Sequence, residues 1–331
     1  MGQYYFRCGK NASETKSIIK DEIIQWITSS ELWQIVDSFG GSLPKGKNTV
    51  ELARWLLDFS DVWDYRRRQR EAMDAKTGEA ARWLISSDMI SKEQEKIVLE
   101  NSVKLGLRET SDPLLEQYDY IIALGGARMS CLFRPKFLFE LLTEKQYCPK
   151  AVVMLSGMRP ISDSERDATD IYAPGADTEF DLINAGAEKV FALEKEYMEE
   201  RYHSSNANSS WAVRRYEKQY PYPIISVSGP SSQPEIRRAN SADTFCFFAK
   251  KQQICPESRV LLVTSQIYVP YQQLEAIRTW AIPNNVYVET VGFPPSWNNV
   301  SQQGMMTAAN YLQEIRSTIQ AVNRYLDSIN R

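Results

Sequence analysis

Apolar side chains recur every three or four residues through the first third of the chain. One series runs through Ile19, Ile23 and Trp26, and another includes Leu52 and Leu56. This spacing places apolar side chains on one face of an α-helix. It predicts that the chain is helical from residue 13 to about residue 110.

Two pairs of residues indicate where helices of this region begin. Asn48 precedes Glu51, and Ser91 precedes Gln94, each by three positions. At this spacing the first side chain accepts a hydrogen bond from the backbone N–H of the second residue. The side chain of the second residue accepts one from the backbone N–H of the first. The pairs predict helices that begin just after Asn48 and just after Ser91.

The pattern changes after Tyr118. Short apolar runs without polar alternation follow, and helical patterns separate them. Such runs are typical of parallel strands with helices on both faces of the sheet. The sequence therefore predicts an α/β fold, a Rossmann-like three-layer parallel sheet with an N-terminal helical extension and a C-terminal helix. The predicted strands are Tyr120–Leu124, Ala151–Leu155, Ile224–Val227, Val260–Thr264 and Val286–Val291.

Two prolines indicate helix starts among these strands. Pro135 and Pro270 fit the first turn of a helix, and proline disfavours helical backbone in the residue before it. Arg134 is therefore expected just outside a helix, at the rim of a nearby pocket.

A further helix is predicted from Thr178 and Asp181, which have the spacing of a cap, onward to about Arg201. The polar stretch 203–210 then predicts a loop.

The end of the chain has the most regular spacing, because apolar residues alternate separations of three and four. A narrow seam of this kind is typical of heptad-like helix packing. We predict that it packs on the N-terminal helices of the same chain, and the alternative is a homodimer through this helix. The seam consists of Met305, Ala308, Leu312, Ile315, Ile319, Val322, Leu326 and Ile329.

Charge and composition narrow the classes of function. The chain has 331 residues, with 39 Lys and Arg against 42 Asp and Glu, which gives a net charge of −3. Nucleic acid is therefore not expected as a partner, since phosphate binding needs a basic excess. The uninterrupted apolar runs are far shorter than the roughly 20 residues that cross a bilayer, and the first residues lack the apolar segment of a signal peptide. We expect a cytoplasmic protein that makes no membrane contact.

Metal binding is also disfavoured. The five cysteines are odd in number and contain no C-x-x-C pair, which argues against a disulfide framework or a zinc ribbon. His203 is the one histidine and stands in the polar loop. A multi-histidine metal site or a Ser-His-Asp triad is therefore not expected.

Candidate chemistry lies where the predicted strands end, because ligands of open parallel sheets bind beyond these ends. Small residues there let the backbone approach a ligand, and hydroxyls can bond it. Arg134 could orient a carboxylate or phosphate. The strand-end candidates are Gly125, Gly126, Ser156, Gly157, Thr264 and Ser265.

Familiar nucleotide motifs are missing from the sequence. It contains neither a G-x-G-x-x-G after the first strand nor a G-x-x-x-x-G-K-[ST] segment. Acidic residues follow the second strand, among them Asp163 and Glu165. They could bond ribose hydroxyls, bind Mg²⁺, or only solvate a loop and cap a helix.

These strand-end segments resemble the YdcF-like or SanA-like family, the domain of unknown function numbered 218, over about residues 118–293. The family pattern of an aliphatic strand followed by glycines and an arginine resembles Ile121–Gly126 with Arg134. Its second pattern is similar to Val152–Gly157 with Glu165 as the acid. Segments similar to the third and fourth patterns are Asn240–Thr244, which includes Asp243, and Val263–Tyr271.

The resemblance implies an adenosyl or nucleotide ligand, with S-adenosylmethionine favoured, because a family member resembles a protein that binds it. It places Glu165 as a general base or ribose contact, and Asn240 and Asp243 beside the ligand. Tyr268 and Tyr271 stand where the family has histidine and arginine, so Tyr268 is the candidate acid. The segment 171–222 resembles an insertion that would form a lid.

We therefore predict a helical region over 1–115 and an α/β domain over 116–331 that binds a small nucleotide-type molecule. An enzyme such as a transferase is the leading hypothesis. The alternatives are a non-catalytic ligand sensor or assembly factor, and a hydrolase that uses carboxylates and a metal.

Overall fold

The protein contains a single mixed β-sheet within the residues that the computed structural model describes, 4–65, 67, 90–299 and 306–329. The strand order is β3-β4-β5-β2-β1-β6-β7. Neighbours from β5 to β7 pair in parallel, whereas β3 and β4 are antiparallel additions beside β5. The strands are β1 (Tyr120–Leu124), β2 (Ala151–Ser156), β3 (Met198–Tyr202), β4 (Trp211–Tyr216), β5 (Ile224–Ser228), β6 (Arg259–Ser265) and β7 (Tyr287–Phe293).

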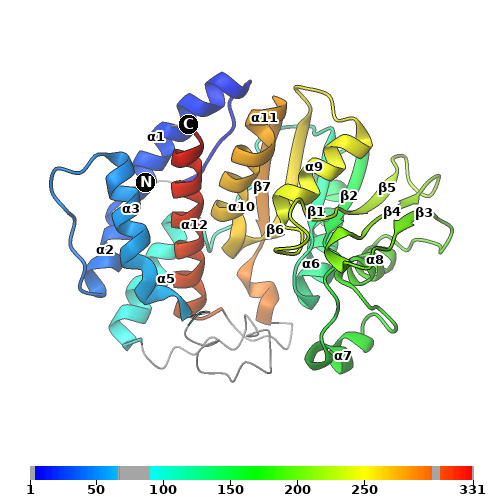
Figure 1. Ribbon diagram of the computed structural model, residues 1–331, viewed down its shortest axis with the longest axis horizontal. Helices are drawn as coiled ribbons and strands as arrows, with labels where there is room; N and C mark the ends of the chain where they lie inside the picture. Colours follow the sequence, from blue (N-terminus) through cyan, green and yellow to red (C-terminus); the bar gives the residue numbers. More distant parts are fainter. Residues whose placement is uncertain (1–3, 66, 68–89, 300–305, 330–331) are drawn as a thin grey trace.

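The five parallel strands are buried because both of their faces are apolar. The paired residues Ile121 and Val152 pack under α6 and α8, whereas Ile122 and Val153 pack under α9 and α10. Helices thus cover both faces (Figure 1), and the predicted three-layer, Rossmann-like α/β fold is confirmed. The helices around the sheet are α6 (Arg128–Glu144), α7 (Asp163–Asp170), α8 (Glu179–Val190), α9 (Ser241–Gln252), α10 (Val269–Ala276) and α11 (Ile282–Asn284).

The N-terminal region is helical, as predicted for the residues that the structure describes. Both predicted capping boxes are present. The Glu51 backbone N–H donates to Asn48 at 3.0 Å, and the Gln94 N–H donates to Ser91 at 3.2 Å. The helices are α1 (Ala12–Ile27), α2 (Ser30–Ser38), α3 (Thr49–Phe59) and α5 (Lys92–Lys104).

The last helix, α12 (Ala308–Ile329), lies between the N-terminal helices and α10 (Figure 1). Its predicted seam is buried from Ala308 to Leu326, whereas Ile329 is 40% exposed and Met305 lies outside the described residues. Packing on the chain's own N-terminal helices is therefore confirmed. One apolar cluster joins these helices, α12 and one face of the sheet.

Pro135 does not begin a helix, so that prediction is wrong. Helix α6 starts at Arg128 and continues through Pro135. Proline there removes only the N–H that would bond the Cys131 carbonyl one turn earlier. Gly186 of α8 lies against that carbonyl so closely that a β-carbon would overlap the oxygen. Pro270, in contrast, lies in the first turn of α10 as predicted.

The helix after Thr178 is shorter than predicted. It ends at Val190, and the chain then forms the hairpin of β3 and β4. The expected lid over 171–222 is also wrong, because much of this segment forms the crossover helix α8 and two added strands. The loop predicted at 203–210 connects the two strands and contains one short turn of helix, Ala207–Ser209.

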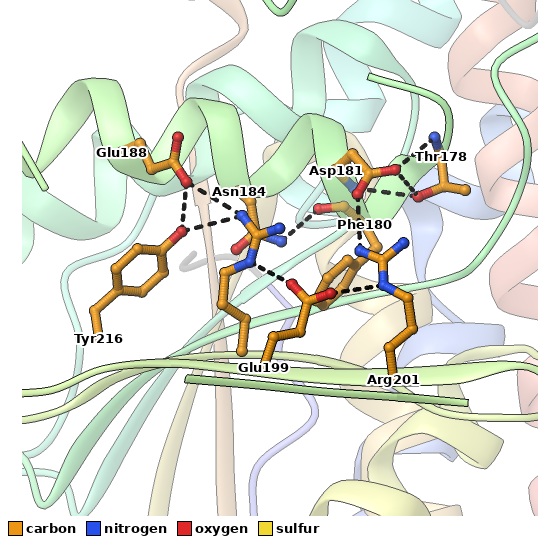
Figure 2. Close-up of polar contacts among 9 residues, drawn as sticks. Thr178, Phe180, Asp181, Asn184, Glu188, Glu199, Arg201 and Tyr216 are labelled. Carbon is orange, nitrogen blue, oxygen red and sulfur yellow. Dashed lines mark hydrogen bonds and ion pairs between the residues drawn. The ribbon is translucent and has the colours of Figure 1, made fainter. Parts of the chain in front are cut away.

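A network of ion pairs holds the β3–β4 hairpin against α8 (Figure 2). Arg214 bonds Glu199 at 2.7 Å and Glu188 at 3.2 Å, and Arg201 bonds Glu199 at 2.7 Å and Asp181 at 3.1 Å. Both guanidinium groups also lie over the Phe180 ring, at 5.4 and 5.7 Å from its centre. Charged strand residues thus have partners on the helix, which explains why the hairpin lacks the continuous apolar runs of the parallel strands.

Candidate functional site

The carboxyl ends of the parallel strands meet at one edge, and the strand order reverses there between β1 and β6. The chain leaves β1 through α6 toward β2, and it leaves β6 through α10 toward β7, in the opposite direction. Ligands of open α/β sheets bind at such a switch point.

Arg134 lies directly at this switch point. Its Nη1 donates to the Leu124 carbonyl at 2.8 Å and to the Gly125 carbonyl, and its Nη2 donates to the Ser265 hydroxyl at 3.3 Å. The guanidinium carbon is 5.7 Å from the centre of the Tyr268 ring. The side chain therefore joins the ends of β1 and β6. The expected position at a pocket rim is wrong, because Arg134 is inside α6 and 4% exposed.

Glu179 brings a carboxylate to the ends of β1 and β2. It begins α8, and its Oε1 lies against Gly125 so closely that a β-carbon there would overlap it. The Gly157 N–H is 3.5 Å from Oε1, and Arg159 Nε is 3.4 Å from Oε2. Burial raises the pKa of Glu179, and the charge of Arg159 opposes this shift. Glu179 is thus a largely buried carboxyl, with 13% of its side chain exposed and with long hydrogen bonds.

Glu165 has a different environment. Its Oε2 is 2.7 Å from Arg159 Nη1, and the same carboxylate caps α7 through Ser162. Burial alone would raise its pKa, but bonding to Arg159 holds the pKa of Glu165 below the ordinary value. The predicted acid is therefore committed to an ion pair and a helix cap.

The structure gathers most of the predicted strand-end residues. Gly125 and Gly126 follow β1, Gly157 follows β2, and the buried hydroxyls at the ends of β2 and β6 belong to Ser156, Thr264 and Ser265. The Ser156 and Thr264 hydroxyls have no hydrogen-bond partner among the described residues.

Asn240 and Asp243 form a separate group. They cap α9, and Asp243 also bonds Arg237 at 2.5 Å. Despite partial burial, Arg237 lowers the pKa of Asp243 to about 2. Their contacts lie within the segment 232–244 and do not include Arg134 or Glu179.

Nothing in the sequence indicates that Arg159 and Glu179 form a pair. A backbone bridge between Pro160 and Thr178, with the Glu179 N–H donating to the Arg159 carbonyl at 2.8 Å, places them side by side. The Thr178–Asp181 cap was a signal that Glu179 begins a helix next to a strand end. Among the described residues, no three His, Cys, Asp or Glu side chains are grouped as a metal site. In the same part of the chain, no helix has the length and apolarity to cross a membrane.

The fold and this edge define a three-layer α/β protein with a buried polar site at the switch point of its sheet. The chain belongs to the Rv3785 family. Residues 10–106 match the family model described as the Rv3785 N-terminal domain. The uncharacterized proteins Rv3785 of Mycobacterium tuberculosis H37Rv and Mb3814 of Mycobacterium bovis are each 34% identical to it over 326 residues. These alignments cover 94% of this chain and 90% of each relative. No solved structure matches.

The resemblance to the YdcF-like or SanA-like family is therefore wrong. The match to the Rv3785 family overturns it. The motifs behind it are short strands that end in glycine and hydroxyl residues, and such ends suit any parallel sheet whose backbone turns sharply into a helix.

Proposed function

We propose that this protein binds a nucleotide-type small molecule, with S-adenosylmethionine as the first candidate, at the carboxyl ends of β1, β2 and β6. The observation that carries the proposal is the partly buried Glu179 carboxylate, which lies against Gly125 and Gly157 at the ends of β1 and β2, beside the switch point of the sheet. Buried ionisable groups with shifted pKa values gather at functional sites, and this edge is where α/β sheets bind ligands.

The contacts of Glu179 are long, so its carboxylate can accept shorter hydrogen bonds from a bound ligand. Its hydrogen bonds of 3.4 and 3.5 Å are well beyond the usual 2.9–3.0 Å. Ribose hydroxyls are donors that a carboxylate can accept at short distance. The unpartnered Ser156 hydroxyl beside Gly125 offers a further bond. Arg134 would act as a positioning residue, because it fixes the Gly125 carbonyl and Ser265.

The same carboxyl suits acid–base chemistry on a bound molecule. Its raised pKa brings it closer to neutral pH, where a general acid or base works best. In this proposal Glu179 takes the role that sequence reasoning gave to Glu165, because Glu165 is engaged by Arg159.

Calorimetric titration with S-adenosylmethionine, S-adenosylhomocysteine, ATP and a nucleotide sugar tests the proposal. Glu179→Gln keeps the shape and removes the charge, so it should weaken binding by about 1.5–3 kcal/mol, the value of a hydrogen bond to a charged group. Glu188→Gln is the matched control, because Glu188 lies in the same helix but bonds Arg214 and Tyr216.

We expect one of the four compounds to bind, with affinity lowered in Glu179→Gln and retained in Glu188→Gln. Circular dichroism would establish that both variants are folded. The absence of binding by all four compounds, or equal affinity in both variants, would contradict the proposal.

A further inference from the structure

A second candidate site lies beside β7, separated from β1 by β6. A partly open cavity of about 250 Å³ is lined by the first described residues of the chain, by the segment 106–114, by α10 and by β7. Its wall includes Tyr4, Tyr5, Phe6, Pro270, Tyr287 and Glu289.

Glu289 brings a carboxylate to this wall. It is 8% exposed, and it accepts hydrogen bonds from the Leu114 N–H at 2.8 Å, from the Tyr287 hydroxyl at 3.3 Å and from the Tyr118 hydroxyl. Leu114 and Tyr287, two of the residues that donate to Glu289, also line the cavity. The carboxylate therefore lies between the segment 106–114 and β7. All three donors are neutral groups.

The described part of the chain supplies no cation to this carboxylate. Arg7 is the only basic residue among the described residues that line the cavity, and its Nε is 2.6 Å from Glu22 Oε1. The Arg7 backbone N–H donates to the same Glu22 carboxylate at 2.7 Å. Two further polar wall residues are paired with each other, since the Thr290 hydroxyl donates to Gln273 at 2.7 Å. Glu289 is thus a buried carboxyl that has no cationic partner among the described residues.

The remaining wall is suited to an organic cation. Tyr4, Tyr5, Phe6 and Tyr287 contribute aromatic rings, whose faces attract positive charge. An apolar cavity of about 150 Å³ holds benzene, so this larger cavity has room for a benzene-sized body and a short chain. An isolated buried carboxylate is costly, and a bound cation would offset that cost.

We propose that this cavity binds a small organic ammonium ion with an apolar body, and that Glu289 is its counter-ion. This site is independent of the proposed nucleotide site, because the two share no residue.

Three probes of similar shape and different charge test the proposal. They are 2-phenylethylammonium, 2-phenylethanol and 3-phenylpropionate, titrated calorimetrically at a mildly alkaline pH. We expect the ammonium ion to bind at least about tenfold more tightly than the alcohol, because it alone pairs with the carboxylate. The propionate should not bind, since it would place two carboxylates together.

Two variants test separately the charge of Glu289 and the free volume of the cavity. Glu289→Gln should lower the affinity for the ammonium ion by about tenfold and change that for the alcohol by less than about threefold. Ser111→Phe adds a ring at a half-buried wall position, keeps Glu289, and should abolish binding of both probes. Glu188→Gln is again the control and should leave both affinities unchanged.

Equal affinities for the ammonium ion and the alcohol would overturn the proposal. So would the failure of the ammonium ion to bind, or an affinity for it that survives Ser111→Phe. If Glu289→Gln does not fold, the probe series on the unaltered protein and the Ser111→Phe variant still decide the question.

Discussion

At the scale of single residues, the neighbours of a buried carboxyl decide its charge. Glu165 and Glu289 are similarly buried, at 5% and 8% exposure. Arg159 pairs with Glu165 and lowers its pKa, whereas Glu289 has only neutral donors, so burial raises its pKa. The surroundings thus stabilise the charged form of Glu165 and the neutral form of Glu289, although both side chains are glutamates.

Glu289 should make the stability of the protein depend on pH. Its pKa in the folded state is above the ordinary value of about 4.3, so the folded chain binds a proton that the unfolded chain has released. In the pH range between these two pKa values, the free energy of unfolding falls as the pH rises. Glu289→Gln removes this contribution, so the stability difference, unaltered protein minus variant, should decrease from mildly acidic to mildly alkaline pH.

Urea unfolding of both proteins across this range measures the difference. The ionisable groups around the carboxyl are Tyr118, Tyr147, Tyr287 and Cys8, and burial raises the pKa of each, that of Cys8 to about 12. They stay neutral in the range tested. A stability difference that does not vary with pH would show that Glu289 titrates normally.

At the scale of elements, the sequence predicted what local patterns determine. The five parallel strands were predictable because each is a short apolar run, and the caps at Asn48 and Ser91 were predictable because their partners lie three residues away. The β3–β4 hairpin was not, because its polar residues bond α8 across 20 to 28 positions of sequence. The Arg159–Glu179 pair was missed for the same reason, since only the folded chain brings it together.

The ion pairs between the β3–β4 hairpin and α8 should contribute to the free energy of unfolding. Arg214→Met removes the partner of Glu188 and Glu199, which are themselves 18% and 20% exposed. Among the described residues, Glu188 then keeps only its bond from Tyr216 and Glu199 only its pair with Arg201, and losing the bonds to the Arg214 guanidinium should cost about 1.5–3 kcal/mol. Arg215→Met is the matched control, because Arg215 follows on β4 and makes one bond, to Gln252 at 3.3 Å.

Guanidinium chloride screens charge, so urea denaturation is the better measurement for both variants. We expect Arg215→Met to cost less than about 1 kcal/mol. Equal losses in the two variants would mean that the network adds nothing specific.

At the scale of the whole molecule, one apolar core connects the two ends of the chain. The cluster includes Trp26 of α1, Leu56 of α3, Ile319 of α12 and Val153 of β2. The family model matches residues 10–106, yet the helices of this segment also pack on α12 and α11, which lie outside it. The division into a region over 1–115 and a domain over 116–331 stays a prediction.

Ile319→Asp should therefore destabilise the whole molecule. Ile319 is fully buried, and an aspartate there places an unpaired charge in the shared core, at a cost of several kcal/mol. Gln320→Asp introduces the same residue at the next, partly exposed position of α12 and should cost much less. Thermal unfolding followed by circular dichroism and by tryptophan fluorescence compares them. Unchanged stability of Ile319→Asp would remove α12 from the core.

The position of α12 sets the order of events during synthesis. The N-terminal helices leave the ribosome well before the helix that covers them, Ala308–Ile329. At about 5–20 residues per second, the roughly 200 residues between the end of the N-terminal segment and α12 take roughly 10–40 s to translate. Throughout that interval Leu56 and its apolar neighbours lack their final partner, so we expect the nascent chain to engage a holding chaperone until α12 emerges.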